Sequence, residues 1–170
     1  MTSATGAQLR GAQSFEGEMI HCVNWSGQRN LRLRAVAVIG RAADVARVLP
    51  PVVAAARRVT VFQTEPVWIL PRSPVPAVAK FLPSALLRCA ARANLRIQVR
   101  DSWVRRQLTP ESATGIHRHN RYYHTLRRAD CTLVTWPIAR LAPRGIRTVD
   151  GIEHRVDTII IAHTAGTEEL

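Results

Sequence analysis

One segment constrains the fold of this chain more than any other, because it places a strand pattern, a helix pattern and a second strand pattern in immediate succession. Leu33–Gly40 is a short apolar run closed by glycine, which is typical of a fully buried parallel strand. Apolar residues then recur at helical spacing over Ala42–Arg58, where Pro50 and Pro51 are expected to kink or interrupt the helix. Val59–Gln63 is a second β-rich run, so the segment predicts a β-α-β unit.

The remaining patterns predict a helical excursion followed by more strands. Prolines recur over residues 71–83, with a short helix expected at Val78–Leu82, and helical spacing covers Ser84–Asn94 and Leu95–Leu108, where Trp103 is expected to be available for burial. The predicted strands are Cys131–Trp136, Ile138–Leu141, Gly145–Val149 and Thr158–Ala162, with turns at residues 143–145 and 150–151. The fold class is therefore α/β, with a mainly parallel sheet and a small antiparallel hairpin.

Length and composition predict one domain of ordinary size. The chain has 170 residues, no run of 18 apolar residues, and a polar segment at residues 1–13. We therefore expect no membrane span and no signal peptide, which favours a cytoplasmic location. The three cysteines show no C-x-x-C pairing, so we expect reduced, mostly packed thiols and neither a disulfide framework nor a zinc site.

The formal charge of +12 comes almost wholly from arginine, because Lys80 is the only lysine. Arginine grips phosphate groups well, so nucleic acid, anionic lipid and phosphorylated cofactors are all candidate partners. Arg88, Arg92, Arg96 and Arg100 lie four residues apart and would line one face of a helix. No helix-turn-helix or aromatic RNA-binding motif accompanies them, and we favour a solvated face over nucleic-acid binding.

A spaced motif precedes the first strand pattern. Phe15, Gly17, His21 and Trp25 follow the spacing F-x-G-x-x-x-H-x-x-x-W. This motif resembles the fingerprint of the Baeyer-Villiger branch of flavin-containing monooxygenases. Segments similar to that family follow in the same order, at residues 59–68, 101–110, 122–123 and 145–151. The resemblance implies a Rossmann-like NAD(P)-binding domain.

The resemblance also implies where the domains divide. Ala4–Gly6 is similar to the A-T-G motif at which the family's backbone leaves its FAD domain, and Ala162–Gly166 is similar to a disturbed copy of the returning motif. Residues 1–32 are then a linker carrying the fingerprint, residues 33–166 the NAD(P)-binding domain with a helical excursion at about 74–110, and residues 167–170 a tail. A FAD-binding domain is not expected within the chain.

The phosphate-binding turn of the family is G-x-G-x-x-G or A, and residues 40–45 stand in its place. Gly40 keeps the first glycine, and Arg41 follows it. Ala42 adds a methyl group where the pyrophosphate is expected, Val45 is expected to crowd the helix against the strand, and Asp44 places a negative charge near the helix start. A binding turn and a turn without a ligand both remain open.

Two further positions bear on the nicotinamide cofactor. Members of the family grip the 2′-phosphate of NADPH with the arginine of Gln-Arg-Thr, whereas this chain has Gln63, Thr64 and Glu65. A carboxylate repels a 2′-phosphate, so we expect NADH to bind no more weakly than NADPH if either binds, with a solvated turn as the alternative. His117 and Arg118 stand where the family has a 2′-phosphate lysine and an arginine that stabilises the flavin peroxide. Arg118 is the candidate catalytic residue, with a surface charge as the alternative.

His117, His119 and His124 fit no metal-ligand spacing, so no metal is expected. The leading functional interpretation is a truncated flavin-dependent monooxygenase-like protein. Its relatives use FAD, NADPH and oxygen on ketones or heteroatoms, and the chain alone is expected to be inactive. One alternative is half of a split enzyme that assembles with a FAD-domain chain, or with a second copy, through an exposed apolar face. The other is a basic module that binds nucleic acid or an anionic surface.

Overall fold

The structure is a computed structural model that describes residues 9–22, 30–63, 65–71, 83–110 and 116–162. Several sequence predictions lie outside these ranges. They are the Ala4–Gly6 motif, Trp25, Thr64, the short helix at Val78–Leu82 and the motif at residues 163–166. Among the described residues, no helix has both the length and the apolar character that crossing a membrane requires.

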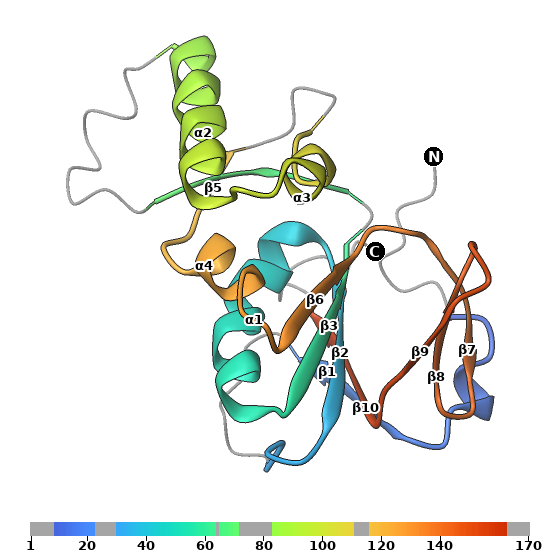
Figure 1. The fold of residues 1–170 in the computed structure, drawn as a ribbon. Coiled ribbons are helices and arrows are strands. Elements are labelled where there is room, and N and C mark those ends of the chain that lie inside the picture. Colours follow the sequence, from blue (N-terminus) through green and yellow to red (C-terminus); the bar gives the residue numbers. More distant parts are fainter. Residues whose placement is uncertain (1–8, 23–29, 64, 72–82, 111–115, 163–170) are drawn as a thin grey trace, which may run out of the picture.

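A five-stranded, all-parallel sheet forms the centre of the fold, in the order β1-β10-β2-β3-β6. The strands are β1 (Glu18–Cys22), β2 (Ala35–Gly40), β3 (Arg58–Phe62), β6 (Cys131–Val134) and β10 (Thr158–Ala162). The three middle strands are mostly buried, as their apolar runs predict. Helices α1 (Ala42–Ala55) and α4 (Tyr122–Leu126) cover one face of this sheet (Figure 1).

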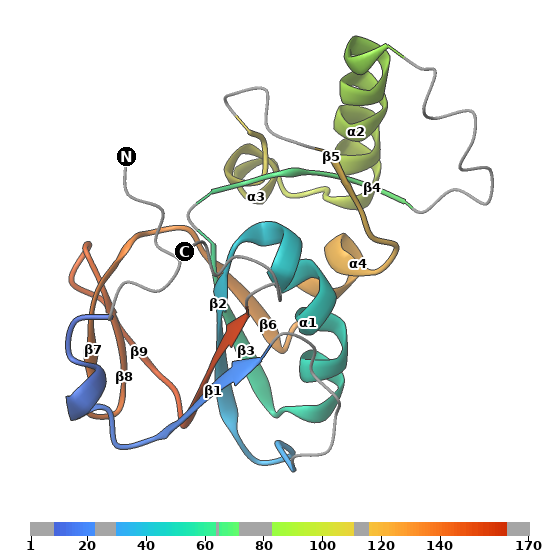
Figure 2. The same cartoon turned by 180° about the vertical axis from the view of Figure 1, so that it is seen from behind.

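An antiparallel sheet covers the other face (Figure 2). It contains β7 (Ile138–Ala142), β8 (Gly145–Thr148) and β9 (Glu153–Arg155), so the predicted hairpin is confirmed and gains a third strand. Phe15, Phe62 and Ile146 pack in the apolar layer between the two sheets. The segment that leads into β1 begins with the short helix η1 (Ala12–Ser14).

A helical excursion connects β3 to its neighbour β6. It contains β4 (Trp68–Leu70), α2 (Ser84–Gln98), α3 (Ser102–Gln107) and β5 (Ile116–Arg118). Strands β4 and β5 pair in parallel as a separate two-stranded sheet. Helix α2 packs on β4, where the side-chain amide of Asn94 donates to the carbonyl of Ile69 over 3.0 Å. The excursion projects beyond the central sheet at the carboxyl end of its strands (Figures 1 and 2).

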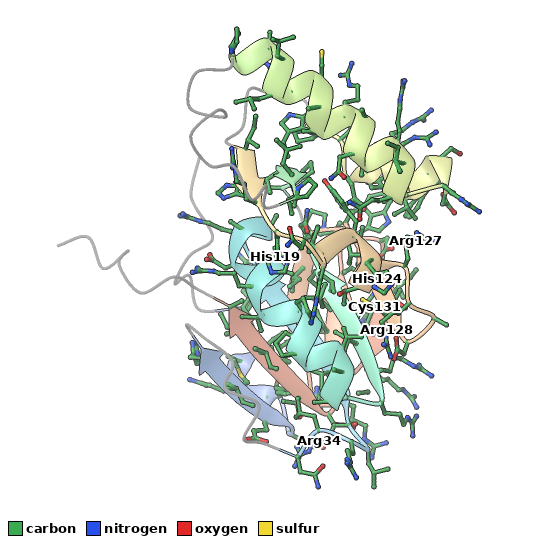
Figure 3. All side chains as sticks on the ribbon, turned by 90° about the vertical axis from the view of Figure 1, so that its left-hand side faces the viewer. Arg34, His119, His124, Arg127, Arg128 and Cys131 are labelled. Carbon is green, nitrogen blue, oxygen red and sulfur yellow. The ribbon has the colours of Figure 1, made fainter. Side chains whose placement is uncertain are left out.

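A polar network ties the amino ends of three strands together. The guanidinium of Arg34 lies 3.4 Å from the carboxylate of Glu18 and donates to the hydroxyl of Thr158 over 3.1 Å. The carboxylate of Asp157 accepts from the backbone N–H of Ala35 over 2.8 Å. Figure 3 places Arg34 at the end of the molecule opposite to α2. This network therefore fixes strand register away from the carboxyl edge of the sheet.

Four expectations about local structure are corrected. Helix α1 runs without interruption through Pro50 and Pro51, because the residues beside them are buried in the core. Strand β1, from the segment expected to be a linker, is the edge strand of the central sheet. Trp103 is 55% exposed rather than buried. Cys89 is an exposed free thiol, whereas Cys131 is buried as expected.

Candidate functional site

The strand-to-helix turn expected to bind a dinucleotide lies at the carboxyl edge of the central sheet. Strand β2 ends at Gly40, Arg41 is the extended N-cap residue, and α1 begins at Ala42. Strand order reverses here, because the chain passes from β2 to β3 on one side and later places β10 on the other. Ligands of open α/β sheets bind at such a switch point.

Gly40 is required by the sheet itself. It pairs with Ala162 of β10, and a Cβ atom added at Gly40 would lie 2.5 Å from the carbonyl oxygen of Ala162. Real Cβ atoms essentially never approach a non-bonded heavy atom so closely. The glycine that the turn shares with dinucleotide-binding motifs therefore has a structural reason that does not involve a ligand.

Three other residues of the turn, Ala42, Asp44 and Val45, are buried. Ala42 is 1% exposed and Val45 is fully buried in the main core, where α1 packs on the sheet. The expected conflict between the Ala42 methyl group and a pyrophosphate stays a prediction. Asp44 is 6% exposed, and its carboxylate accepts from the Arg47 guanidinium over 2.8 Å. Arg47 thus offsets the negative charge that Asp44 brings to the start of the helix.

The end of β3 is also engaged in internal contacts. Gln63 is 3% exposed, and its amide oxygen accepts a hydrogen bond from the hydroxyl of Tyr122. Tyr122 is 1% exposed, and burial raises the pKa of its hydroxyl well above the usual value. Glu65 is exposed two residues further along the chain. Of these two candidate cofactor residues, Glu65 is a solvent-exposed carboxylate, whereas Gln63 is hydrogen-bonded to Tyr122 of α4.

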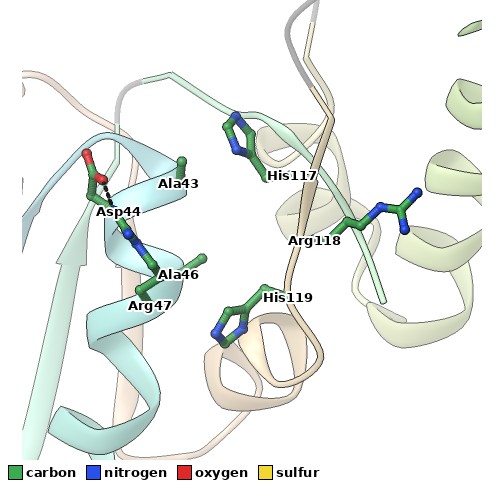
Figure 4. Close-up of a pocket in the computed structure, with 7 residues that line it drawn as sticks. All are labelled: Ala43, Asp44, Ala46, Arg47, His117, Arg118 and His119. Carbon is green, nitrogen blue, oxygen red and sulfur yellow. Dashed lines mark hydrogen bonds and ion pairs between the residues drawn. The ribbon is translucent and has the colours of Figure 1, made fainter. Parts of the chain in front are cut away.

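A hollow of about 310 Å³ opens between the first two turns of α1 and strand β5. Figure 4 shows His117 and His119 directed toward α1, whereas Arg118 points to the opposite side. Side chains along a strand alternate in this way. The residues that line the hollow are Ala43, Asp44, Ala46, Arg47, His117, Arg118 and His119. The structure therefore brings His117 close to the phosphate-binding turn and directs the Arg118 side chain away from it.

The hollow combines imidazole, guanidinium and carboxylate groups. The backbone N–H of Arg121 donates to Nδ1 of His119 over 3.4 Å. Arg47 is fixed by Asp44 across one helical turn. Within the part of the chain that the structure describes, no three His, Cys, Asp or Glu side chains could hold a metal ion. The hollow is suited to an anionic or hydrogen-bonding ligand.

The three fingerprint residues that the structure describes do not line the hollow. Phe15 is buried between the sheets, and a Cβ atom at Gly17 would lie within 3 Å of the Phe15 ring and the Asp157 carbonyl oxygen. His21 lies on β1 opposite Ile161 and is exposed. Phe15 and Gly17 therefore serve packing between η1, β1 and the antiparallel sheet.

Sequence reasoning missed the contribution of Arg47 and His119 to the hollow. Arg47 lies within a helical pattern that predicts only its helix, and the sequence around His119 raises only the question of a metal ligand. The signal available was the placement of Ala43, Ala46 and Arg47 at helical spacing on one face of α1. Nothing in the sequence placed that face beside residues 117–119, because β5 is only three residues long.

Comparison with known proteins gives relatives of one kind. No protein-family model matches the chain. A Baeyer-Villiger monooxygenase of Pseudomonas aeruginosa is 27% identical over 190 aligned positions, covering 90% of this chain and 36% of the relative. An uncharacterized monooxygenase of Mycobacterium bovis is 29% identical over 206 positions, covering 95% and 41%. The chain thus spans about two fifths of the length of these relatives.

Solved structures confirm the fold. An oxidized steroid monooxygenase bound to NADP superposes with a TM-score of 0.79 at 19% identity, covering 95% of this chain and 44% of that one. The open form of a cyclohexanone monooxygenase gives a TM-score of 0.75 at 21% identity, covering 94% and 45%. The Rossmann-like α/β fold is therefore shown, and the resemblance to Baeyer-Villiger monooxygenases that the motifs indicate is confirmed.

Proposed function

We propose that residues 33–166 act as the NAD(P)H-binding domain of a flavin-dependent monooxygenase, with residues 1–32 leading into it and supplying β1 at the edge of its sheet, and residues 167–170 leading out. The observation that carries the proposal is the turn from Gly40 to α1 at the switch point of an all-parallel sheet. Its geometry suits a dinucleotide whose pyrophosphate lies at the start of α1. The likeness to an NADP-bound steroid monooxygenase supports the same cofactor class.

Oxygenation of a ketone or heteroatom requires more than this domain. Flavin performs the oxygen chemistry in such enzymes, and the protein binds and orients it. The described residues form one central parallel sheet, with an antiparallel sheet and a helical excursion attached. We therefore propose that these residues bind nicotinamide and leave oxygen activation to a FAD-binding domain, supplied by the same chain or by a partner chain. In isolation they are expected to catalyse no oxygenation.

The charges around the turn support a preference between the two nicotinamide cofactors. Glu65 is exposed beyond the end of β3, where a 2′-phosphate would approach, and its carboxylate repels that group. The same carboxylate accepts hydrogen bonds from ribose hydroxyl groups. His117 and Arg47, in the hollow beside α1, offer partial compensation to a phosphate. We expect NADH to bind at least as tightly as NADPH.

The proposal is tested by titrating the purified chain with NADH and NADPH, with and without FAD, while following nicotinamide fluorescence. Saturable binding of NADH in the submillimolar range supports the proposal. Binding of neither nucleotide, by a chain whose circular dichroism and cooperative unfolding show that it is folded, contradicts it. Oxygen consumption with NADPH and a ketone but without any added FAD-domain protein would contradict the expected inactivity of the isolated domain.

A further inference from the structure

Helix α2 divides its surface into three faces. Ala91 and Leu95 are at most 1% exposed and attach the helix to the main core. The opposite side carries two exposed faces, one apolar and one basic. Leu86, Ile97 and the helical arginines are exposed in the structure, so both faces are open to an external surface.

The apolar face contains the large exposed side chains of the helix. Leu86 is 55% exposed and Ile97 is 77% exposed, with exposed Ala90 and Ala93 at helical spacing between them. We refer to these four residues as the α2 apolar stripe. It covers three helical turns, or about 16 Å. Large apolar side chains arranged in one stripe, rather than scattered singly, mark an interaction surface.

The basic face lies beside the stripe and carries Arg88, Arg92 and Arg96, all exposed. Arg100 follows the helix end, and residues 83–100 include no Asp or Glu. No ion pair is found for the three helical arginines among the described residues. The Cζ atom of Arg92 lies 5.9 Å from the centre of the Trp68 ring. This contact holds the guanidinium near β4, while the Arg92 side chain stays exposed.

The position of the helix leaves it accessible. Figures 1 and 2 show α2 projecting beyond the central sheet, on the side away from the antiparallel sheet. A flat partner could reach α2 without meeting β7, β8 or β9. The formal charge of +12 adds a long-range attraction to any anionic partner.

We propose that α2 docks the protein onto an anionic lipid bilayer, with the α2 apolar stripe inserted at the headgroup boundary and the arginines on lipid phosphates. A helix with exposed Leu and Ile on one face, arginine on the adjacent face and low overall hydrophobicity lies in the plane of a membrane interface. Anionic lipid attracts each basic side chain near its surface. The proposal concerns association with a surface and involves no membrane-spanning segment.

The same observations favour lipid over nucleic acid. Binding to nucleic-acid phosphates would leave the apolar side chains of Leu86 and Ile97 exposed to water. The two amide side chains of α2, which are the type that reads adenine edges, are hydrogen-bonded within the fold. The amide of Gln98 donates to Asn94 over 2.7 Å, and Asn94 donates to the Ile69 carbonyl over 3.0 Å.

The test is co-sedimentation of the full chain with vesicles of neutral phosphatidylcholine and with vesicles containing 40% phosphatidylglycerol, without any nucleotide. Partitioning onto the anionic vesicles is expected to exceed that onto neutral vesicles at least about tenfold and to fall as salt rises. Leu86→Ser with Ile97→Ser is expected to weaken it about tenfold, and Arg88→Glu with Arg96→Glu about 20-fold or more. All four substitutions are at exposed positions, and circular dichroism checks folding.

Matched controls separate the helix from the charge of the whole chain. Arg127→Glu with Arg144→Glu makes the same change in net charge at exposed positions outside α2, and Leu33→Ser alters a residue that is 83% exposed elsewhere. Both controls are expected to keep most of the partitioning. Equal losses in the control and α2 variants would overturn the proposal. Unchanged partitioning of Leu86→Ser with Ile97→Ser would also overturn it, as would tight binding of duplex DNA that depends on the same arginines.

Discussion

Gly40 and Ala162 face each other across β2 and β10 so closely that no side chain fits at position 40. The nearest atom to an added Cβ would be the Ala162 carbonyl oxygen, which belongs to the backbone and cannot rotate away. The turn and the centre of the sheet therefore depend on one glycine.

Gly40→Ala is expected to lower the free energy of unfolding by about 1–3 kcal/mol, because two central strands must move apart. Urea unfolding followed by circular dichroism measures the change. Adding Ala162→Gly removes a Cβ but leaves the carbonyl oxygen, so it is expected to give little rescue. Full rescue by Ala162→Gly would show that the Ala162 carbonyl is not the constraint.

Tyr122→Phe removes the only described partner of the Gln63 amide oxygen in a buried position. An unsatisfied buried acceptor costs about 1–3 kcal/mol, whereas removing both partners costs less. We therefore expect Tyr122→Phe to destabilise the fold more than the combined variant Tyr122→Phe with Gln63→Leu. Urea unfolding of the two variants and the parent checks this order, and additive losses would contradict it.

Pro51→Ala is expected to stabilise the protein. Pro51 is exposed inside α1, where it lacks the N–H that would bond one turn back. Restoring that N–H is expected to raise the free energy of unfolding by about 1–3 kcal/mol. Pro137→Ala, an exposed proline outside any helix, serves as the control and is expected to change stability by less than about 0.5 kcal/mol. A decrease for Pro51→Ala would show that the proline ring contributes packing that alanine cannot replace.

Glu65→Gln is expected to raise affinity for NADPH relative to NADH, because it removes a negative charge from an exposed position beyond β3. We expect the ratio of the two dissociation constants to shift about threefold to tenfold toward NADPH. Glu153→Gln, an exposed carboxylate on β9, is the matched control and is expected to leave the ratio unchanged. Fluorescence titration of both variants measures this ratio. Equal shifts in the two variants would show that the net charge of the chain, and not Glu65 itself, sets the preference.

Alkaline pH is expected to destabilise the fold through its buried acids, which include Cys131 and Tyr123 as well as Tyr122. Burial raises the pKa of the Cys131 thiol from 9.0 to about 12 and the pKa of Tyr123 from 10.0 to about 12. Both groups are neutral when protonated, and the unfolded chain releases these protons first. Their contribution is therefore complete below pH 9 and is lost as pH rises toward 12, by up to about 1.4 kcal/mol per pH unit for each group.

Urea unfolding at pH values from 7 to 11 measures this loss of stability. Cys131→Ala removes the thiol and is expected to make the decline between pH 9 and 10 shallower than in the parent chain. An identical decline in both proteins would show that Cys131 does not carry the effect.

The long strands and helices could be predicted from sequence because their patterns are local. Strand β2 with its closing glycine and helix α2 lie close to where their periodicities place them. Strands β4 and β5 could not be predicted, because a strand of three residues is too short to show an alternation of apolar and polar residues. The continuity of α1 through Pro50 could not be predicted. The sequence shows the proline, which costs a helical hydrogen bond, but it does not show the burial that offsets this cost. The buried residues are Val48, Leu49, Val52 and Val53.

The candidate site was predicted in part. Gly40 and the start of α1 follow from the motif, and the structure places them at the switch point. The hollow could not be predicted, since it joins Arg47 to His117 and His119 across 70 residues of chain with no local signal. The buried role of Gln63 was missed because its partner Tyr122 comes from a helix only five residues long.

The position of β10 sets the order in which the protein can fold. It is the last described strand in the chain, yet it lies between β1 and β2, and it pairs Glu18 with Thr158. During synthesis, β1 and one edge of β2 therefore remain without their neighbour until residues 158–162 have been made. Folding is expected to be slow, with strand edges exposed to other nascent chains during that interval.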